Sequence, residues 1–108
     1  MIVVDDKTIK LSKGDTLYLG ISFNGDVPSD DTIAIFSIKQ NSRNPESIIE
    51  KTHYIDDGKI DIILESEDTN SLDVGNYIWD VRLKYSNGDV FTPFKPALFQ
   101  LMEAVGNV

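Results

Sequence analysis

Apolar and polar residues alternate along three stretches of the chain, which is the pattern of a β-strand with one buried face. These stretches are Thr16 to Phe23, Lys59 to Glu65 and Asn76 to Ser86. Successive side chains of a strand point to opposite faces, so every second residue should enter the core. The expected core side chains are Leu17, Leu19, Ile21 and Phe23, then Ile60, Ile62 and Leu64, and finally Tyr77, Trp79, Val81, Leu83 and Tyr85.

Two other stretches predict strands with less regular patterns. Thr32 to Lys39 is apolar on both faces, and we assign the face with Ala34, Phe36 and Ile38 to the core. Ser47 to Ile55 is a weaker strand. Between Ser66 and Ser71 we expect at most one helical turn.

The last stretch, Asp89 to Met102, predicts a strand that is interrupted by Pro93 and Pro96. Proline has no N–H to donate to a ladder, so this strand is expected at a sheet edge. Before it, Asn87-Gly88 lies between two strand-like runs, and both residues tolerate positive φ. We therefore expect a hairpin there.

Turn-forming residues separate these segments at short intervals, as at Lys13-Gly14-Asp15, Asn24-Gly25-Asp26 and Asp56-Asp57-Gly58. About seven strands in 108 residues match the size and rhythm of an immunoglobulin-like domain. The prediction is an all-β protein, an antiparallel two-sheet immunoglobulin-like β-sandwich, formed by a single domain over 1–108.

One motif supports this fold at the level of single residues. The stretch Asp73-Val74-Gly75-Asn76-Tyr77-Ile78-Trp79 resembles the tyrosine corner of immunoglobulin-like domains. There a tyrosine ring enters the core and its hydroxyl binds an upstream backbone group, which we expect between Asn70 and Asp73. Trp79 stands where those domains carry a cysteine, so the disulfide is lost. The alternative is an ordinary glycine-containing turn before a strand.

The charge and composition of the chain exclude some kinds of binding partner. Ten Lys and Arg against eighteen Asp and Glu give a net charge of -8, which repels nucleic acid and anionic membranes. We expect no nucleic-acid partner and no membrane partner. The N-terminal sequence lacks the pattern of a signal peptide, and no apolar run approaches the ~20 residues of a membrane span.

The residue types that carry catalysis are scarce. His53 is the only histidine, there is no cysteine, and neither a G-x-x-x-x-G-K phosphate loop nor a G-x-S-x-G turn occurs. We expect no enzyme, no catalytic residues and no cofactor. We also expect no metal site, although the carboxylates that are frequent in the second half of the chain are ligands that calcium takes. They match no EF-hand loop: Asp56, Asp57, Asp61, Glu65, Glu67, Asp68 and Asp73.

A succession of motifs resembles the small β-sandwich structural proteins of bacteriophages and prophages, akin to the N-terminal domain of phage baseplate upper proteins. These motifs are Leu11-Ser12-Lys13-Gly14-Asp15-Thr16, Phe36-Ser37-Ile38-Lys39, Leu72 to Leu83 and Asn87 to Thr92. The stretch Lys95-Pro96-Ala97 departs from that family, which tends to have a glycine there. The resemblance implies a virion role in the tail, baseplate or capsid, with assembly in the bacterial cytoplasm and other virion proteins as partners.

Two surfaces are candidates for binding. If Phe36 and Trp79 point inward, Ile33, Ile35 and Ile78 point outward on neighbouring strands, and we expect them to form an interface with another virion protein or a second copy. The alternative function is a receptor- or carbohydrate-binding immunoglobulin-like module. Its candidate aromatic residues are Tyr18, Tyr54 and Phe91.

Overall fold

The protein is mostly β. The computed structural model describes residues 8–22, 29, 31–41, 43, 46–92 and 96–103. Phe23, the Asn24-Gly25-Asp26 turn and Pro93 lie outside the described residues. Within the described ranges the elements are β1 (Ile9–Ser12), β2 (Leu17–Ser22), β3 (Ile33–Lys39), β4 (Ile49–Tyr54), β5 (Lys59–Leu64), α1 (Ser66–Asn70), β6 (Gly75–Lys84), β7 (Val90–Phe91) and β8 (Ala97–Met102).

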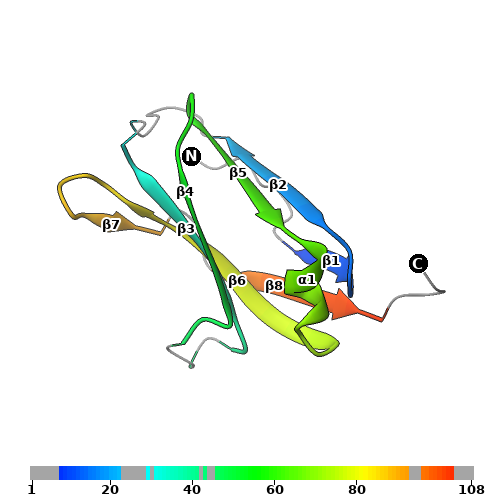
Figure 1. Ribbon diagram of the computed structural model, residues 1–108. Coiled ribbons are helices and arrows are strands. Elements are labelled where there is room, and N and C mark those ends of the chain that lie inside the picture. The colour runs from blue at the N-terminus through cyan, green and yellow to red at the C-terminus, as the bar shows by residue number, and fades with distance from the viewer. Residues whose placement is uncertain are drawn as a thin grey trace.

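The strands form two sheets. The larger has six strands in the order β1-β8-β6-β3-β4, with β7 paired to β6, and the smaller is the pair β2-β5 (Figure 1). The prediction of purely antiparallel sheets is wrong at one place, because β1 runs parallel to β8. A parallel pair needs a long connection, and nearly the whole chain separates these two strands. Alternation predicts which face of a strand is buried but not its direction.

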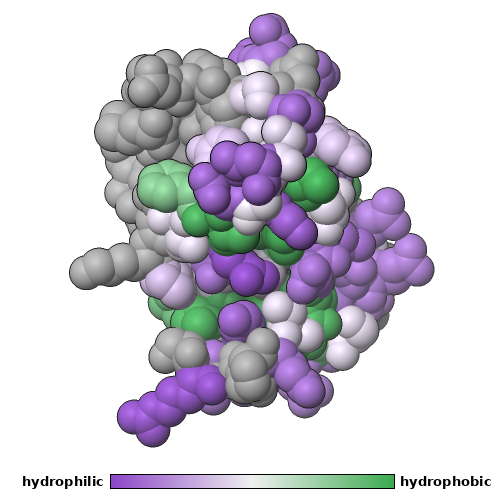
Figure 2. All heavy atoms as spheres, turned by 90° about the vertical axis from the view of Figure 1, so that its left-hand side faces the viewer, coloured by the Kyte–Doolittle hydropathy of each residue, from purple (hydrophilic) through white to green (hydrophobic). Residues whose placement is uncertain are grey.

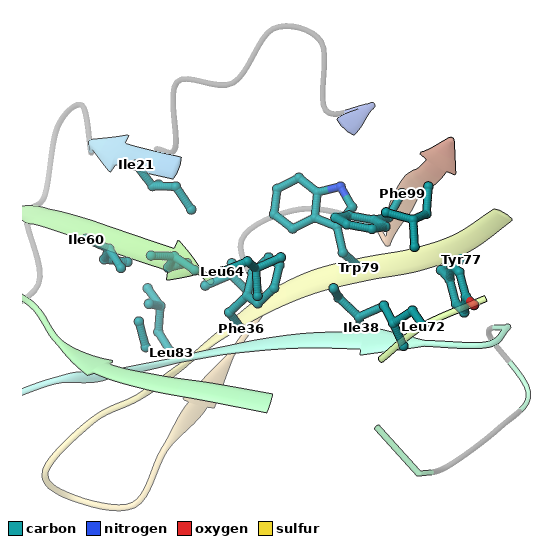
Figure 3. Close-up of a cluster of buried hydrophobic side chains, with 14 of the residues drawn as sticks. Ile21, Phe36, Ile38, Ile60, Leu64, Leu72, Tyr77, Trp79, Leu83 and Phe99 are labelled. Atoms are coloured by element: carbon teal, nitrogen blue, oxygen red, sulfur yellow. The ribbon is translucent and has the colours of Figure 1, made fainter. Parts of the chain in front are cut away.

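One core lies between the two sheets. Figure 3 shows the side chains of Ile21 and Ile60, from the small sheet, in the space that the rings of Phe36 and Trp79, from the large sheet, also enter. The Trp79 side chain is 1% exposed, and its ring centroid lies 5.7 Å from that of Phe36. The predicted core residues that are fully buried are Ile21, Ala34, Phe36, Ile38, Ile60, Ile62, Leu64, Tyr77, Trp79, Val81 and Leu83.

Three expected core residues are less buried than the alternation predicted. Leu17 and Leu19 are only partly buried and pack against the margin of the core, and Tyr85 is half-buried. Leu17 and Leu19 lie on β2, whose side away from β5 has no neighbouring strand among the described residues. Tyr85 follows the last residue of β6, where the strand leaves the core for the turn.

The final strand is not at an edge, contrary to the sequence-based expectation. β8 lies between β1 and β6. Pro96 immediately precedes Ala97, the first residue of β8, so its missing N–H falls outside the ladder. The proline therefore marks the start of β8 and does not prevent other strands from pairing with β8 on both of its edges.

The predicted hairpin is present between β6 and β7. The Gly88 N–H donates to the Tyr85 carbonyl at 2.9 Å, and the Tyr85 N–H donates to the Asp89 carbonyl at 2.8 Å. Gly88 has φ of 95°, whereas Asn87 is not among the described residues with positive φ. This is the pattern of a three-residue loop that ends in a glycine bulge, not of a two-residue turn with two positive φ angles.

The helical turn α1 holds the turn between β1 and β2. The Gly14 N–H donates to Thr69 Oγ1 at 3.0 Å, and Thr69 Oγ1 can donate to the Asp15 or the Ser66 carbonyl, each at 3.0 Å. Gly14 has φ of 89°, a backbone conformation that side chains disfavour. The Lys13-Gly14-Asp15 turn is thus tied to a helix more than fifty residues away in sequence.

Candidate interaction surfaces

The predicted corner forms at the start of β6. The Tyr77 hydroxyl donates to the Asp73 carbonyl at 2.6 Å, which is a backbone group within the interval expected from the sequence. Burial and the Asp73 charge raise the pKa of Tyr77, although the hydrogen bond to the Asp73 backbone acts in the opposite direction. Gly75 is the first residue of the strand, and Trp79 enters the core two residues after Tyr77. The corner thereby holds the loop after α1 against the sheet.

The three isoleucines of the expected interface do lie on the outer face of the six-stranded sheet. Ile33, Ile35 and Ile78 are half-buried, and the core residues alternate with them on β3 and β6. They do not form one patch, however. The register places Ile35 opposite Arg82, whereas Ile78 lies opposite Lys39, near the other end of β3.

The outer face therefore carries two apolar groups. Ile33 and Ile35 lie beside exposed Tyr54, which is opposite Ile33 on β4. Ile78 lies opposite exposed Leu98 on β8. Figure 2 shows the side of the molecule that faces left in Figure 1, with apolar residues in two groups and polar residues between them. A sequence pattern cannot give this separation because it depends on cross-strand register.

The row between the two groups holds unpartnered polar atoms. Ser37 and Asp80 are directly opposite each other on β3 and β6. Ser37 is 1% exposed, and neither its Oγ nor Asp80 Oδ1 has a hydrogen-bond partner, although both atoms are shielded from water. Buried polar atoms without a partner are uncommon and costly, but atoms that water does not reach are closed to a docking protein as well, so the row is a polar boundary between the two apolar groups.

Charges of both signs surround this row. By register and alternation, Glu50 lies beside Ser37 on β4, while Lys39 and Arg82 flank the row on β3 and β6. The ion pair that the described side chains form, Lys51 Nζ to Asp68 at 3.0 Å, lies on the other face and joins β4 to α1. Burial raises the pKa of Asp68, but hydrogen bonds from Lys51 and the Glu65 backbone, with the Lys51 charge, lower it overall. The charges on the outer face remain available to a partner.

A second surface lies on the small sheet, whose outer face is formed by alternate residues of β2 and β5. The register pairs Tyr18 with Ile63 and Gly20 with Asp61. A hollow of about 310 Å³ opens over these pairs, and we call it the Tyr18 hollow. Its lining residues are Tyr18, Leu19, Gly20, Asp61, Ile62 and Ile63. The sequence suggested Tyr18 as a candidate aromatic residue for carbohydrate binding, but the glycine two positions later, which marks the hollow, was missed.

The residues considered for catalysis or metal binding are dispersed. His53 is half-buried on β4 next to exposed Tyr54. Among the described residues, no three His, Cys, Asp or Glu side chains come together in a way that could hold a metal ion. Within the same residues, no helix is long and apolar enough to span a membrane.

Comparisons with known proteins give a likeness to a solved structure. Neither protein-family models nor curated proteins match the sequence. Among solved structures, the chain is similar to one described in a study of host cell surface retention of a 1.5-MDa bacterial ice-binding adhesin, with 14% identity and a TM-score of 0.46. The match covers 87% of this chain and 28% of that chain, so this protein spans less than a third of the length of its structural neighbour.

Proposed function

We propose that the protein is a non-enzymatic structural module of a phage or prophage particle, acting through protein–protein contacts on the outer face of its six-stranded sheet. The observation that carries the proposal is the pair of apolar groups on this face, which include exposed Tyr54 and exposed Leu98 and have a polar row between them. A partner that covered Ile35 and Ile78 with apolar side chains would remove their remaining exposed surface from water. The virion setting is supported by the sequence motifs, and the proposed route is assembly in the bacterial cytoplasm.

The proposed fold is an immunoglobulin-like sandwich. Read in chain order, β3, β6 and β8 occupy the places of strands C, F and G, which are neighbours in one sheet of that fold. β2 and β5 occupy those of strands B and E, which pair in the other sheet. The hydrogen bond of Tyr77 to the Asp73 backbone adds a local feature of the same fold.

The partner that we propose first is a second copy of the chain. The face places acidic Glu50 and Asp80 close to basic Lys39 and Arg82, so a second copy that docks with an offset can meet charges of the opposite sign. The face therefore carries charges that complement themselves, even though the whole chain bears a net charge of -8. Another virion protein with the same pattern of charges would fit in the same way.

Sedimentation over a concentration series tests this proposal. The parent protein should associate, and Ile35→Lys with Ile78→Lys should remain monomeric because both lysines would place charge in the contact. Ile63→Lys, an exposed position on the small sheet, is the matched control and should associate like the parent. A parent that stays monomeric, and that also fails to bind products of genes adjacent to its own, would contradict the proposal.

The alternative function, a receptor- or carbohydrate-binding immunoglobulin-like module, is favoured by a different observation. All three aromatic residues that the sequence suggested for it are exposed: Tyr18, Tyr54 and Phe91. The neighbouring open reading frames distinguish the two functions. Tail, portal or capsid genes support the virion module, whereas glycosidase or adhesin genes support the binding module.

A further inference from the structure

Gly20 has no evident structural reason to be a glycine. It lies inside β2, where glycine costs roughly 0.5–1 kcal/mol relative to alanine. Its φ is not in the positive range, and an added Cβ would meet only Asp61 Oδ1, at the ordinary contact distance of 3.6 Å. A glycine within a strand often marks a place where a ligand or another backbone approaches closely. Gly20 forms part of the floor of the Tyr18 hollow.

One side of the hollow is an aromatic ring that the described residues leave largely exposed. Tyr18 is 75% exposed, the most exposed of the large apolar and aromatic side chains among the described residues. It lies two residues from Gly20 on the same face, opposite Ile63. A rigid ring with a polar tip, beside a flat floor, offers an apolar face to a ring-shaped ligand at small entropic cost.

Polar groups lie at the other side of the same floor. Asp61 is opposite Gly20 on β5, and its ionised carboxylate can accept two hydrogen bonds. Ser22 and Lys59 form the next cross-strand pair and line an adjoining depression with Gly20 and Asp61. The ammonium of Lys59 in the adjoining depression offsets the carboxylate of Asp61 in the hollow, so the ligand need not be an ion.

From this geometry we propose that the Tyr18 hollow binds a neutral sugar ring. One face of the sugar would stack on Tyr18, and two adjacent hydroxyls would donate to the carboxylate of Asp61. The absence of a side chain at Gly20 would allow the ring to approach the sheet closely. This inference goes beyond the proposed virion role and uses the opposite sheet, so the outcome of one test does not decide the other.

Backbone amide shifts in a nuclear magnetic resonance titration test the site. The probes are neutral methyl glycosides of glucose, galactose, mannose and N-acetylglucosamine. At least one should shift amides of β2 and β5 around Gly20 and Asp61, with a dissociation constant of about 0.1–10 mM, as expected for a shallow site. Tyr18→Ala should weaken binding about tenfold, since an aromatic contact contributes up to about 1.5 kcal/mol.

Two variants separate binding from folding. Gly20→Val should abolish the shifts by filling the hollow, while its free energy of unfolding stays equal to or above that of the parent. Val90→Ala removes an exposed apolar side chain from the other sheet and should bind like the parent. The proposal is overturned if no glycoside shifts these amides, if binding survives both Tyr18→Ala and Gly20→Val, or if raising the concentration of the protein alone produces the same shifts, because a second copy would then occupy the hollow.

Discussion

Trp79 occupies the centre of the space between the two sheets. It is 1% exposed, and its ring lies tilted against Phe36. Replacing it with alanine removes the largest buried side chain and leaves a cavity that the strands cannot close. We expect Trp79→Ala to lower the free energy of unfolding by about 3–5 kcal/mol, measured by chemical denaturation. Tyr54→Ala, an exposed control, should change it by about 0.5 kcal/mol or less.

For Tyr77, the dependence of stability on pH distinguishes the contribution of the hydroxyl from that of the ring. Tyr77→Phe keeps the buried ring and loses the bond to Asp73, for an expected cost of about 0.5–1.5 kcal/mol at neutral pH. Because burial raises the pKa of Tyr77 in the folded state, the stability linked to its protonated form is complete below the unfolded pKa of about 10. That stability is lost as the pH rises through the folded pKa.

Denaturation at a series of alkaline pH values therefore distinguishes the two proteins. The parent should lose more stability than Tyr77→Phe as the pH rises above about 10. Equal losses in the two proteins would show that the Tyr77 hydroxyl is not held in its neutral form by the fold.

At the scale of elements, one buried hydroxyl ties α1 to the turn between β1 and β2. Thr69 is fully buried, and its Oγ1 accepts from Gly14 N–H. Thr69→Val keeps the shape but leaves that N–H without an acceptor, at an expected cost of about 1–3 kcal/mol. Hydrogen exchange at the Gly14 amide provides the direct measurement. It should become fast in Thr69→Val and remain slow in Thr69→Ser, and equal rates in both variants would contradict this account.

The faces of the strands could be predicted from sequence, but their neighbours could not. Alternation placed Phe36 and Trp79 in the core correctly because a side-chain period of two is a local property. The pairing of β1 with β8 joins strands at opposite ends of the chain. No local pattern specifies which strand of a sandwich will cover a particular edge.

The two candidate sites could be predicted from the sequence even less completely than the fold. Ile35 and Ile78 were placed on the correct face, yet the register puts the Ser37 row between them. Tyr18 was a candidate aromatic residue for carbohydrate binding, but its proximity to Asp61 arises only from the pairing of β2 with β5. Both sites are products of register, which long-range packing sets and a single sequence does not display.

The whole molecule depends on contact between two sheets of unequal size. A two-stranded sheet is marginal by itself in water, so β2 and β5 should be stable only while Ile21 and Ile60 pack against the larger sheet. We expect one cooperative unfolding transition. Trp79, the single tryptophan of the chain, reports on the large sheet through its fluorescence.

Native-state hydrogen exchange provides the second measurement, at amides of β5 and β6. The Ile62 amide on β5 and the Val81 amide on β6 should exchange with the same free energy, equal to that of global unfolding seen by Trp79 fluorescence. The reason is that separating the sheets exposes the core of both, so neither retains its structure alone. Exchange of Ile62 at a clearly lower free energy than Val81 would mean that the small sheet opens independently. The Tyr18 hollow would then lie on a separable unit, and a sugar bound there should raise the protection of Ile62 without changing that of Val81.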